Sequence, residues 1–227
     1  MRLGNRLMTI AAKIEKGMAV ADIGTDHAQL PIYLVTEGIS KRVIATDIIT
    51  GPYERARENI EKFCLQDFIQ LRLGPGLTPI KAGEADVAVI AGMGGLTIIN
   101  IIDESRDIAD SFKKLILQPM RHQAKLREFL FSIGYQITDE DVAVEGNRFY
   151  EIMVVQKAGE VPFDEIDVLV GPVLRHKKTP EVYKYFCSRI EKLQAIIRAL
   201  DTVSSPAGKK SLLELSKEFQ ALKEVMK

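Results

Sequence analysis

Apolar residues along the first part of the chain follow two alternating patterns. Short, almost wholly apolar runs are typical of strands buried in a parallel sheet, and apolar residues at every third or fourth position are typical of amphipathic helices. The predicted strands are residues 19–23, 41–47, 68–73, 85–91 and 114–119. The predicted helices are residues 4–16, 30–37, 52–63, 96–102 and 123–132. This alternation predicts an α/β fold.

Two β-rich runs follow, at residues 135–145 and 149–156, and the turn signal Gly146-Asn147-Arg148 lies between them. We expect them to form an antiparallel hairpin. Five strands separated by helices and followed by a hairpin are typical of methyltransferases that use S-adenosylmethionine (SAM). A dehydrogenase would instead continue the alternation of strands and helices.

The C-terminal part has a different period. Apolar residues step by four and three along residues 186–200 and again along residues 212–226, and the turn sequence 204–208 lies between them. This pattern predicts two helices in a coiled-coil-like antiparallel hairpin. Residues 157–178, rich in Gly, Pro and charge, are the predicted link. We therefore expect a catalytic domain at residues 1–160 and a helical domain at residues 161–227.

The first predicted strand leads into the sequence Asp22-Ile-Gly24-Thr-Asp26-His27. A buried strand, a glycine turn and a helix form the first unit of a nucleotide-binding sheet, in which backbone can approach a ligand closely. A dinucleotide fingerprint needs a second glycine where Asp26 stands, and a carboxylate there would repel a pyrophosphate. A cofactor without phosphate, such as SAM, fits better.

Two further features belong to the same predicted site. Asp47 ends the second strand, 23 residues beyond Gly24, close to the roughly 20 residues expected before a ribose-binding acid. The alternative is that Asp47 caps the following helix. Three glycines in the sequence Gly92-Met93-Gly94-Gly95 would leave room for a ligand at the end of a central strand, whereas a plain turn would rarely need all three.

The amino-acid composition limits which partners and which cellular compartment we expect for the protein. The chain has 31 basic and 31 acidic residues, so a polyanion must be held by a local patch rather than by net charge. Two cysteines indicate a reducing compartment and neither disulfides nor a metal site. No run approaches the roughly 18 apolar residues of a membrane span, so we expect a cytoplasmic protein without membrane contact.

Two basic groups are candidates for contact with nucleic acid. Arg2, Arg6, Lys13 and Lys16 lie on one face of the first predicted helix, with Glu15 as the single acid. The approach to the C-terminal hairpin contains a second group: Arg175, Lys177, Lys178, Lys184, Arg189 and Lys192. Each group is either a solvated surface or a contact with RNA phosphate.

Several short motifs together resemble one bacterial family, the tRNA (adenine-N1)-methyltransferases that modify the adenine at tRNA position 22. The motifs are Asp-Ile-Gly-Thr-Asp-His-Ala (22–28), Gly51-Pro52, Gly76-Leu77, Ala-Gly-Met-Gly-Gly (91–95), Leu-Gln-Pro (117–119) and Val-Gly-Pro (170–172). The resemblance covers nearly the whole chain. It implies a Rossmann-like domain that binds SAM, a C-terminal coiled-coil domain, and tRNA as the substrate.

The resemblance also implies roles for individual residues. Asp22, Gly24, Asp26 and His27 would line the methionine end of the cofactor, Asp47 would bind the ribose, and Gly92, Met93 and Gly94 would border the methyl-transfer site. Ile48, Gly76 and Ala91 complete the expected cofactor site, and Gln118 and Pro119 are expected near the substrate. One departure is Pro75, which stands where the family usually has an acid that meets the cofactor's adenine.

The expected chemistry needs no base, because N1 of adenine carries a free lone pair. The enzyme must place the reacting atoms and stabilise the charge that moves onto the base. Asp26 would stabilise this charge or accept a hydrogen bond from the adenine amino group. His27 has either a direct or a structural role, and Gln118 would bond the flipped base, cap a helix or contact the cofactor.

Three other functions remain open from the sequence. One is an NAD-binding oxidoreductase, which Asp26 disfavours. Another is a SAM-dependent methyltransferase for another RNA, a small molecule or a protein. The third is a non-catalytic tRNA-binding module, against which the intact Asp22, Gly24 and Asp47 argue. The apolar heptads fit a monomer or a weak homodimer equally well.

Overall fold

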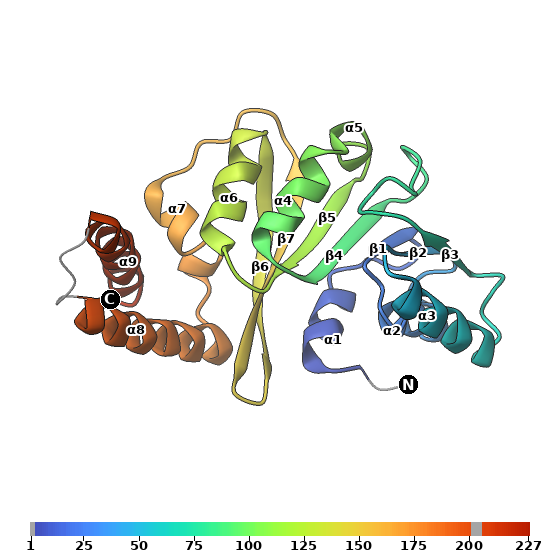
Figure 1. Ribbon diagram of the computed structural model, residues 1–227, viewed down its shortest axis with the longest axis horizontal. Helices are drawn as coiled ribbons and strands as arrows, with labels where there is room; N and C mark the ends of the chain where they lie inside the picture. Colours follow the sequence, from blue (N-terminus) through green and yellow to red (C-terminus); the bar gives the residue numbers. More distant parts are fainter. Residues whose placement is uncertain (1–2, 201–205) are drawn as a thin grey trace.

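A single sheet of seven strands crosses the molecule (Figure 1). The computed structural model describes residues 3–200 and 206–227. The strands are β1 (Val20–Ile23), β2 (Val43–Asp47), β3 (Ile69–Leu73), β4 (Val87–Met93), β5 (Lys114–Pro119), β6 (Tyr135–Glu145) and β7 (Arg148–Lys157). Their order is β3-β2-β1-β4-β5-β7-β6, and β7 runs antiparallel to both of its neighbours. The α/β fold and the terminal hairpin predicted from the sequence are confirmed.

Helices cover both faces of this sheet. On one face lie α1 (Asn5–Ala11), α2 (Gln29–Thr36) and α3 (Thr50–Lys62), and on the other lie α4 (Gly95–Asp103), α5 (Arg106–Ala109) and α6 (Gln123–Ser132). Side chains alternate along β1, because Ala21 and Ile23 pack on the second face and Val20 packs on the first. This alternation is the period of a strand buried on both sides.

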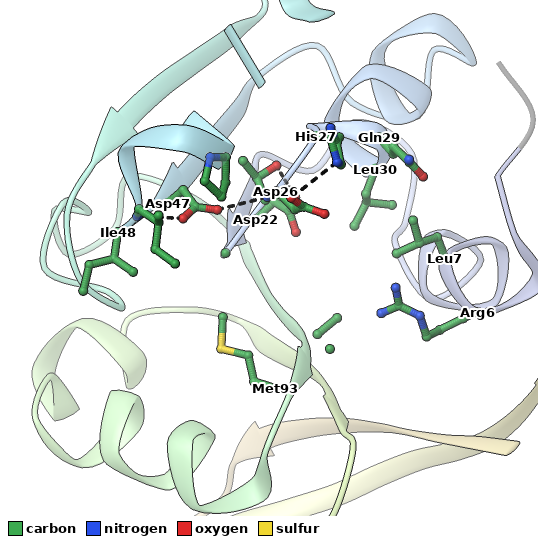
Figure 2. Close-up of a pocket in the computed structure, with 16 residues that line it drawn as sticks. Arg6, Leu7, Asp22, Asp26, His27, Gln29, Leu30, Asp47, Ile48 and Met93 are labelled. Atoms are coloured by element: carbon green, nitrogen blue, oxygen red, sulfur yellow. Dashed lines mark hydrogen bonds and ion pairs between the residues drawn. The ribbon is translucent and has the colours of Figure 1, made fainter. Parts of the chain in front are cut away.

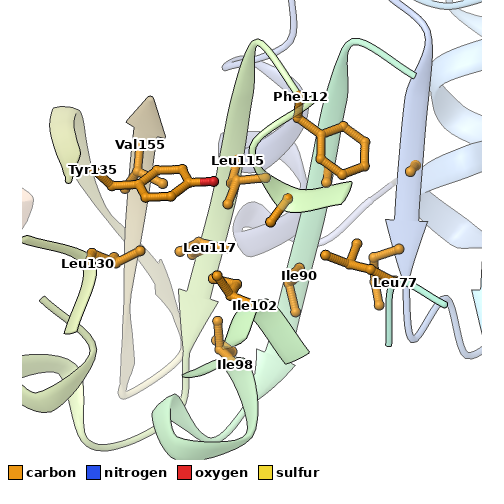
Figure 3. Close-up of a cluster of buried hydrophobic side chains, with 14 of the residues drawn as sticks. Leu77, Ile90, Ile98, Ile102, Phe112, Leu115, Leu117, Leu130, Tyr135 and Val155 are labelled. Carbon is orange, nitrogen blue, oxygen red and sulfur yellow. The ribbon is translucent and has the colours of Figure 1, made fainter. Parts of the chain in front are cut away.

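The core on the α4–α6 face consists of closely packed aliphatic and aromatic side chains (Figure 3). Ile98 and Ile102 of α4 and Leu130 of α6 meet Leu115 and Leu117 of β5, and all five are fully buried. This packing supports the carboxyl end of β4, where part of the candidate site lies.

The structure corrects two sequence-based expectations. The first helix ends at Ala11 rather than near Lys16, and Lys13 beyond it pairs with Asp139 and Asp141 at 2.7 and 2.9 Å. Lys13 is therefore neutralised within the protein and does not belong to a free basic face. The expected link at residues 157–178 also contains α7 (Glu165–Leu169) and the 3₁₀ helix η1 (Leu174–His176).

Two C-terminal helices, α8 (Pro180–Leu200) and α9 (Pro206–Val225), lie beyond β6 at one end of the molecule (Figure 1). Phe186 and Leu193 of α8 and Leu222 of α9 are buried in a third cluster, which also includes Val142 of β6. Ile197 and Leu200, further along α8, are only half-buried. Of the predicted turn at residues 204–208, residues 204 and 205 lie outside the described residues, and residues 206–208 begin α9 instead. The helix pair is present, and its coiled-coil geometry stays a prediction.

Candidate functional site

The candidate site is a cavity of about 510 Å³ at the carboxyl ends of β1, β2 and β4 (Figure 2). The chain leaves β1 for β2 on one side and returns to place β4 on the other side of β1. Ligands of open α/β sheets bind at such a switch point. The cavity is lined by Arg6, Leu7, Asp22, Gly24, Thr25, Asp26, His27, Gln29, Leu30, Asp47, Ile48, Ile49, Pro52, Ala91, Gly92 and Met93.

The turn after β1 is held in a conformation that brings its backbone to the cavity. Gly24 has a φ of +73°, and a Cβ atom on it would lie 2.3 Å from Cε of Met93. Asp26 and Ala28 also have positive φ values, of 53° and 54°. Gly24 is therefore required by its left-handed backbone and by the close approach of Met93, which leaves no room for a side chain.

Asp22 at the end of β1 is buried, and its Oδ2 accepts a hydrogen bond from Thr25 Oγ1 at 2.7 Å. Burial raises the pKa of Asp22 to about 6, although the Thr25 bond and the positive charge of Arg6 oppose the shift. The negative charge of Asp47 adds to it. A cationic ligand would reverse the shift, because it would stabilise the ionised carboxyl group.

Asp47 fixes the turn and the start of α3 at the same time. Its Oδ2 accepts the backbone N–H of Asp26 at 3.1 Å, and its Oδ1 accepts the N–H of Ile49 at 2.9 Å. The second bond is made to Ile49, the N-cap residue before α3, and no side chain caps this helix, so the alternative role of Asp47 as its cap is wrong. Each carboxylate oxygen accepts about two hydrogen bonds, so capacity for ribose hydroxyls remains.

Asp26 and His27 are the more accessible polar side chains of the turn. The side chain of Asp26 is 64% exposed, and its Oδ1 lies 3.6 Å from Nε2 of His27. Asn59 of α3 donates to the backbone carbonyl of His27 at 3.0 Å, which fixes the backbone rather than the ring. Asp26 can therefore meet an incoming substrate from the mouth of the cavity.

The glycines after β4 have different structural reasons. Gly92 has a φ of +77°, and its N–H donates to Oε1 of Gln118 at 3.1 Å. Gly95 is buried, and a Cβ atom on it would lie 2.7 Å from the carbonyl oxygen of His122. Gly94 lines neither this cavity nor the adjacent one described below. The idea that all three glycines open space for a ligand thus applies to Gly92, whereas Gly95 allows α4 to pack.

Gln118 at the end of β5 is completely buried and bonded within the protein. Its Oε1 accepts from Nη1 of Arg6 as well as from Gly92, and its Nε2 donates to the carbonyl of Pro119. Its amide therefore links α1 to the end of β4. A contact of Gln118 with the flipped base stays a prediction, and Pro119 is buried outside the cavity lining.

A second cavity of about 210 Å³ adjoins the first, and Gly24, Asp47, Ile48 and Met93 line both. Its walls include Pro75, Gly76, Leu77 and Ile101. Sequence reasoning missed Ile101 and Asn100, because α4 reaches this place only through tertiary packing. Apolar walls of this kind suit a flat heterocycle, so Pro75 contributes packing where an acid would contribute a hydrogen bond.

The two cavities fit the groups of SAM. Three aspartates surround the first, where positive charges are favoured, Asp47 stands between the two cavities, and the second is apolar.

Comparisons with known proteins decide the family. The model of a family described as tRNA (adenine(22)-N(1))-methyltransferase matches residues 20–224. The chain belongs to this family. It is 35% identical to the Bacillus subtilis (strain 168) protein of that name, over all of this chain and 98% of the relative.

Two solved structures of relatives contain the cofactor or its product. A Streptococcus pneumoniae protein in complex with S-adenosyl-L-methionine has a TM-score of 0.88, with 34% identity and full coverage of both chains. M. capricolum TrmK in complex with S-adenosyl-homocysteine has a TM-score of 0.82, with 27% identity over 99% of this chain and 97% of that one. The cofactor that the cavity chemistry favours is therefore the one found in structures of similar proteins.

The basic residues expected to bind tRNA in this family are not all free. Lys177 donates to the carbonyl of Glu140 at 2.7 Å and lies 3.1 Å from Asp141 and 3.5 Å from Asp139. Lys177 and Lys178 line a separate cavity beside α8, which shares no residue with the first. Arg2 lies outside the described residues. A tRNA contact through these residues stays a prediction.

Proposed function

We propose that the chain transfers the methyl group of SAM to N1 of the adenine at position 22 of tRNA. Its membership of the family, over residues 20–224, carries this proposal. The cavity with three aspartates at the switch point supports it, because this chemistry suits a cationic cofactor. With tRNA as the substrate, we expect the protein to be cytoplasmic. Among the described residues, no helix is both long enough and apolar enough to cross a membrane.

We infer the following positions for the cofactor. Asp22 and the turn at Gly24 would hold its methionine part, Asp47 would accept bonds from the ribose hydroxyls, and the apolar cavity with Pro75 and Ile101 would take its adenine. Ile48 and Met93 line both cavities and would pack along its length. When bound, SAM supplies an electrophilic methyl group.

The residues of this chain would position the substrate adenine rather than deprotonate it, because N1 already carries a lone pair. N1 lies on the Watson–Crick edge, so the base must leave its stack before it reaches the cavity. Asp26 at the mouth would stabilise the positive charge that develops on the base, or accept a hydrogen bond from its amino group.

Labelled SAM and unmodified bacterial tRNA test the proposal. We expect incorporation of one methyl group, and a stop of reverse transcription at the adenine of position 22. Asp26→Asn should lower the turnover rate by roughly 100-fold, because it removes a charge that acts in the transition state. Asp67→Asn, an exposed change outside both cavities, is the matched control and should leave the rate unchanged.

Other results would redirect the proposal. Unchanged turnover of Asp26→Asn would contradict the role of its charge, and methylation of another base would keep the reaction but not the position. SAM binding without methylation of any tRNA would favour a small-molecule or protein substrate. Sedimentation with and without tRNA would distinguish the monomer from the weak homodimer, both of which remain predictions.

A further inference from the structure

The first cavity has an uneven distribution of charge. Asp22, Asp26 and Asp47 contribute three carboxyl groups, and among the described residues that line it only Arg6 carries a permanent positive charge. SAM carries a sulfonium, an ammonium and a carboxylate group at neutral pH. The aspartates complement the two cationic groups, but they would repel the carboxylate unless a cation stands beside it.

Arg6 is held at its backbone and at the tip of its side chain. Its backbone N–H donates to Oε1 of Glu145 at 2.8 Å, and its Nη1 donates to Oε1 of Gln118 at 3.1 Å. Its guanidinium carbon lies 5.7 Å from the centroid of the Tyr150 ring. Figure 2 shows the side chain extending from α1 toward the cavity, across from the three aspartates.

The side-chain amide of Gln118, which accepts the bond from Arg6, is itself fixed in place. Gln118 is fully buried, its Oε1 also accepts the N–H of Gly92, and its Nε2 donates to the carbonyl of Pro119. Within the described chain, Nε and Nη2 of Arg6 make no hydrogen bond or ion pair. A preorganised guanidinium with free donors therefore faces the cavity.

We propose that Arg6 binds the carboxylate of the methionine part of SAM through the N–H groups that Gln118 leaves free. This inference rests on the proposed function, because it requires SAM as the cofactor. A guanidinium matches a carboxylate with two parallel N–H···O bonds, which are short and strong. The role differs from the contact with RNA phosphate that the sequence predicts for Arg6.

The other basic group in the lining is less suited to this role. The imidazole of His27 lies 3.6 Å from Oδ1 of Asp26, so a carboxylate already stands beside it. Lys177 and Lys178 line a different cavity. Arg6 also opposes the rise in the pKa of Asp22, so the two groups interact electrostatically.

SAM and decarboxylated SAM test the proposal, because they differ only in the carboxylate. Binding of each compound would be measured by calorimetry, without tRNA, for the wild type, Arg6→Ala, Arg6→Lys and Arg57→Ala. We expect Arg6→Ala to weaken SAM roughly 10- to 100-fold, and to change decarboxylated SAM by no more than about twofold. Arg6→Lys should lie between, because an ammonium keeps the charge but lacks the planar pair of N–H donors that matches a carboxylate.

The control removes the same charge from an exposed position on α3, where Arg57 pairs with Glu54, and should change neither affinity. Equal losses for SAM and decarboxylated SAM in Arg6→Ala would overturn the proposal, since the variant would then have damaged the whole site. Unchanged SAM binding by Arg6→Ala would also overturn it, and a separate measurement of weaker tRNA binding by this variant would then favour the phosphate contact. A wild type that binds neither compound would refute the proposed function itself.

Discussion

Asp22 is a residue whose charge depends on the fold. Its sequence context, a strand end before a glycine turn, predicts a place in the cofactor site, and the cavity includes it. Its buried carboxyl group has a pKa of about 6 rather than the usual 3.8. Burial of an ionised carboxyl group in the absence of a cationic ligand costs stability.

The pH dependence of stability follows from this shift. Well below the usual pKa of 3.8, Asp22 is protonated in both the folded and the unfolded chain. As the pH rises the unfolded chain ionises first, so Asp22 lowers the free energy of unfolding until the folded pKa of about 6 is passed. Asp22→Asn removes this decrease in the free energy of unfolding. The variant should therefore be more stable than the wild type by about 3 kcal/mol near pH 7.5, and by less near pH 4.5.

Urea unfolding at the two pH values measures this difference in the absence of SAM. Asn can still accept the Thr25 hydroxyl bond, so the comparison isolates the charge. The exposed Asp67→Asn variant should show no such trend. An advantage of Asp22→Asn that does not change with pH would show that the carboxyl group is not titrating in this range.

At the residue scale, spacing predicts the members of the site that come from one turn or one strand end. Asp22, Gly24 and Asp47 follow from a single strand–turn–helix unit and the next strand. The bond between Arg6 and Gln118 joins residues 112 positions apart, so no local pattern contains it. The sequence places both near the substrate but cannot show that one anchors the other.

At the scale of elements, the start of α4 shows how a glycine motif combines two requirements. Gly95 donates its N–H to the carbonyl of Arg121 at 2.8 Å, so α4 begins in contact with the segment before α6. A Cβ atom on Gly95 would lie within 2.8 Å of the carbonyl oxygens of both Arg121 and His122. Neither backbone oxygen can move without shifting α6.

Gly95→Ala should therefore lower the free energy of unfolding by roughly 1–3 kcal/mol. The neighbouring Gly94→Ala is the matched control. Gly94 has a φ of −66°, and the nearest atom to a Cβ there is Nε of Arg121 at 3.4 Å, at the end of a flexible side chain. Thermal unfolding of the two variants checks the difference, and equal losses would contradict the packing argument.

The elements themselves were predictable where the pattern is strong and local. β5 and α6 have the bounds that the sequence predicts, because each is a clear apolar run or stripe between punctuating residues. The segment predicted as a link contains α7, which is only five residues long and begins with a capping box formed by Asp164 and Asp167. So short a helix gives no periodic signal, and it is stabilised by packing that the sequence does not reveal.

At the scale of the whole molecule, a buried ionic cluster joins the sheet to the C-terminal helices. Arg127 of α6 lies between Glu140 of β6 and Glu151 of β7, and all three are no more than 1% exposed. Glu151 also accepts bonds from Tyr185 and Arg189 of α8. Burial alone would raise the pKa of Glu151, but the two arginines lower it, so this carboxylate stays charged.

The sequence did not predict this junction. It divides the chain near residue 160, where composition changes, but the cluster and the apolar contacts of Val142 join the sheet and helices across that division. Charged residues at these positions look like solvated surface in the sequence, and only the antiparallel pairing of β6 with β7 brings Glu140 and Glu151 to one arginine.

Two glutamates that pair with the C-terminal helices provide a test of this junction. Glu151→Gln removes a buried charge from between Arg127 and Arg189 and should lower the free energy of unfolding by roughly 3 kcal/mol. Glu165→Gln breaks a pair with Lys217 of α9 in which both side chains are more than half exposed, and it should change stability by less than about 1 kcal/mol. Urea unfolding compares the variants, and hydrogen exchange should show lost protection in α8 only for Glu151→Gln. Equal effects of the two changes would mean that the buried cluster does not hold the helices to the sheet.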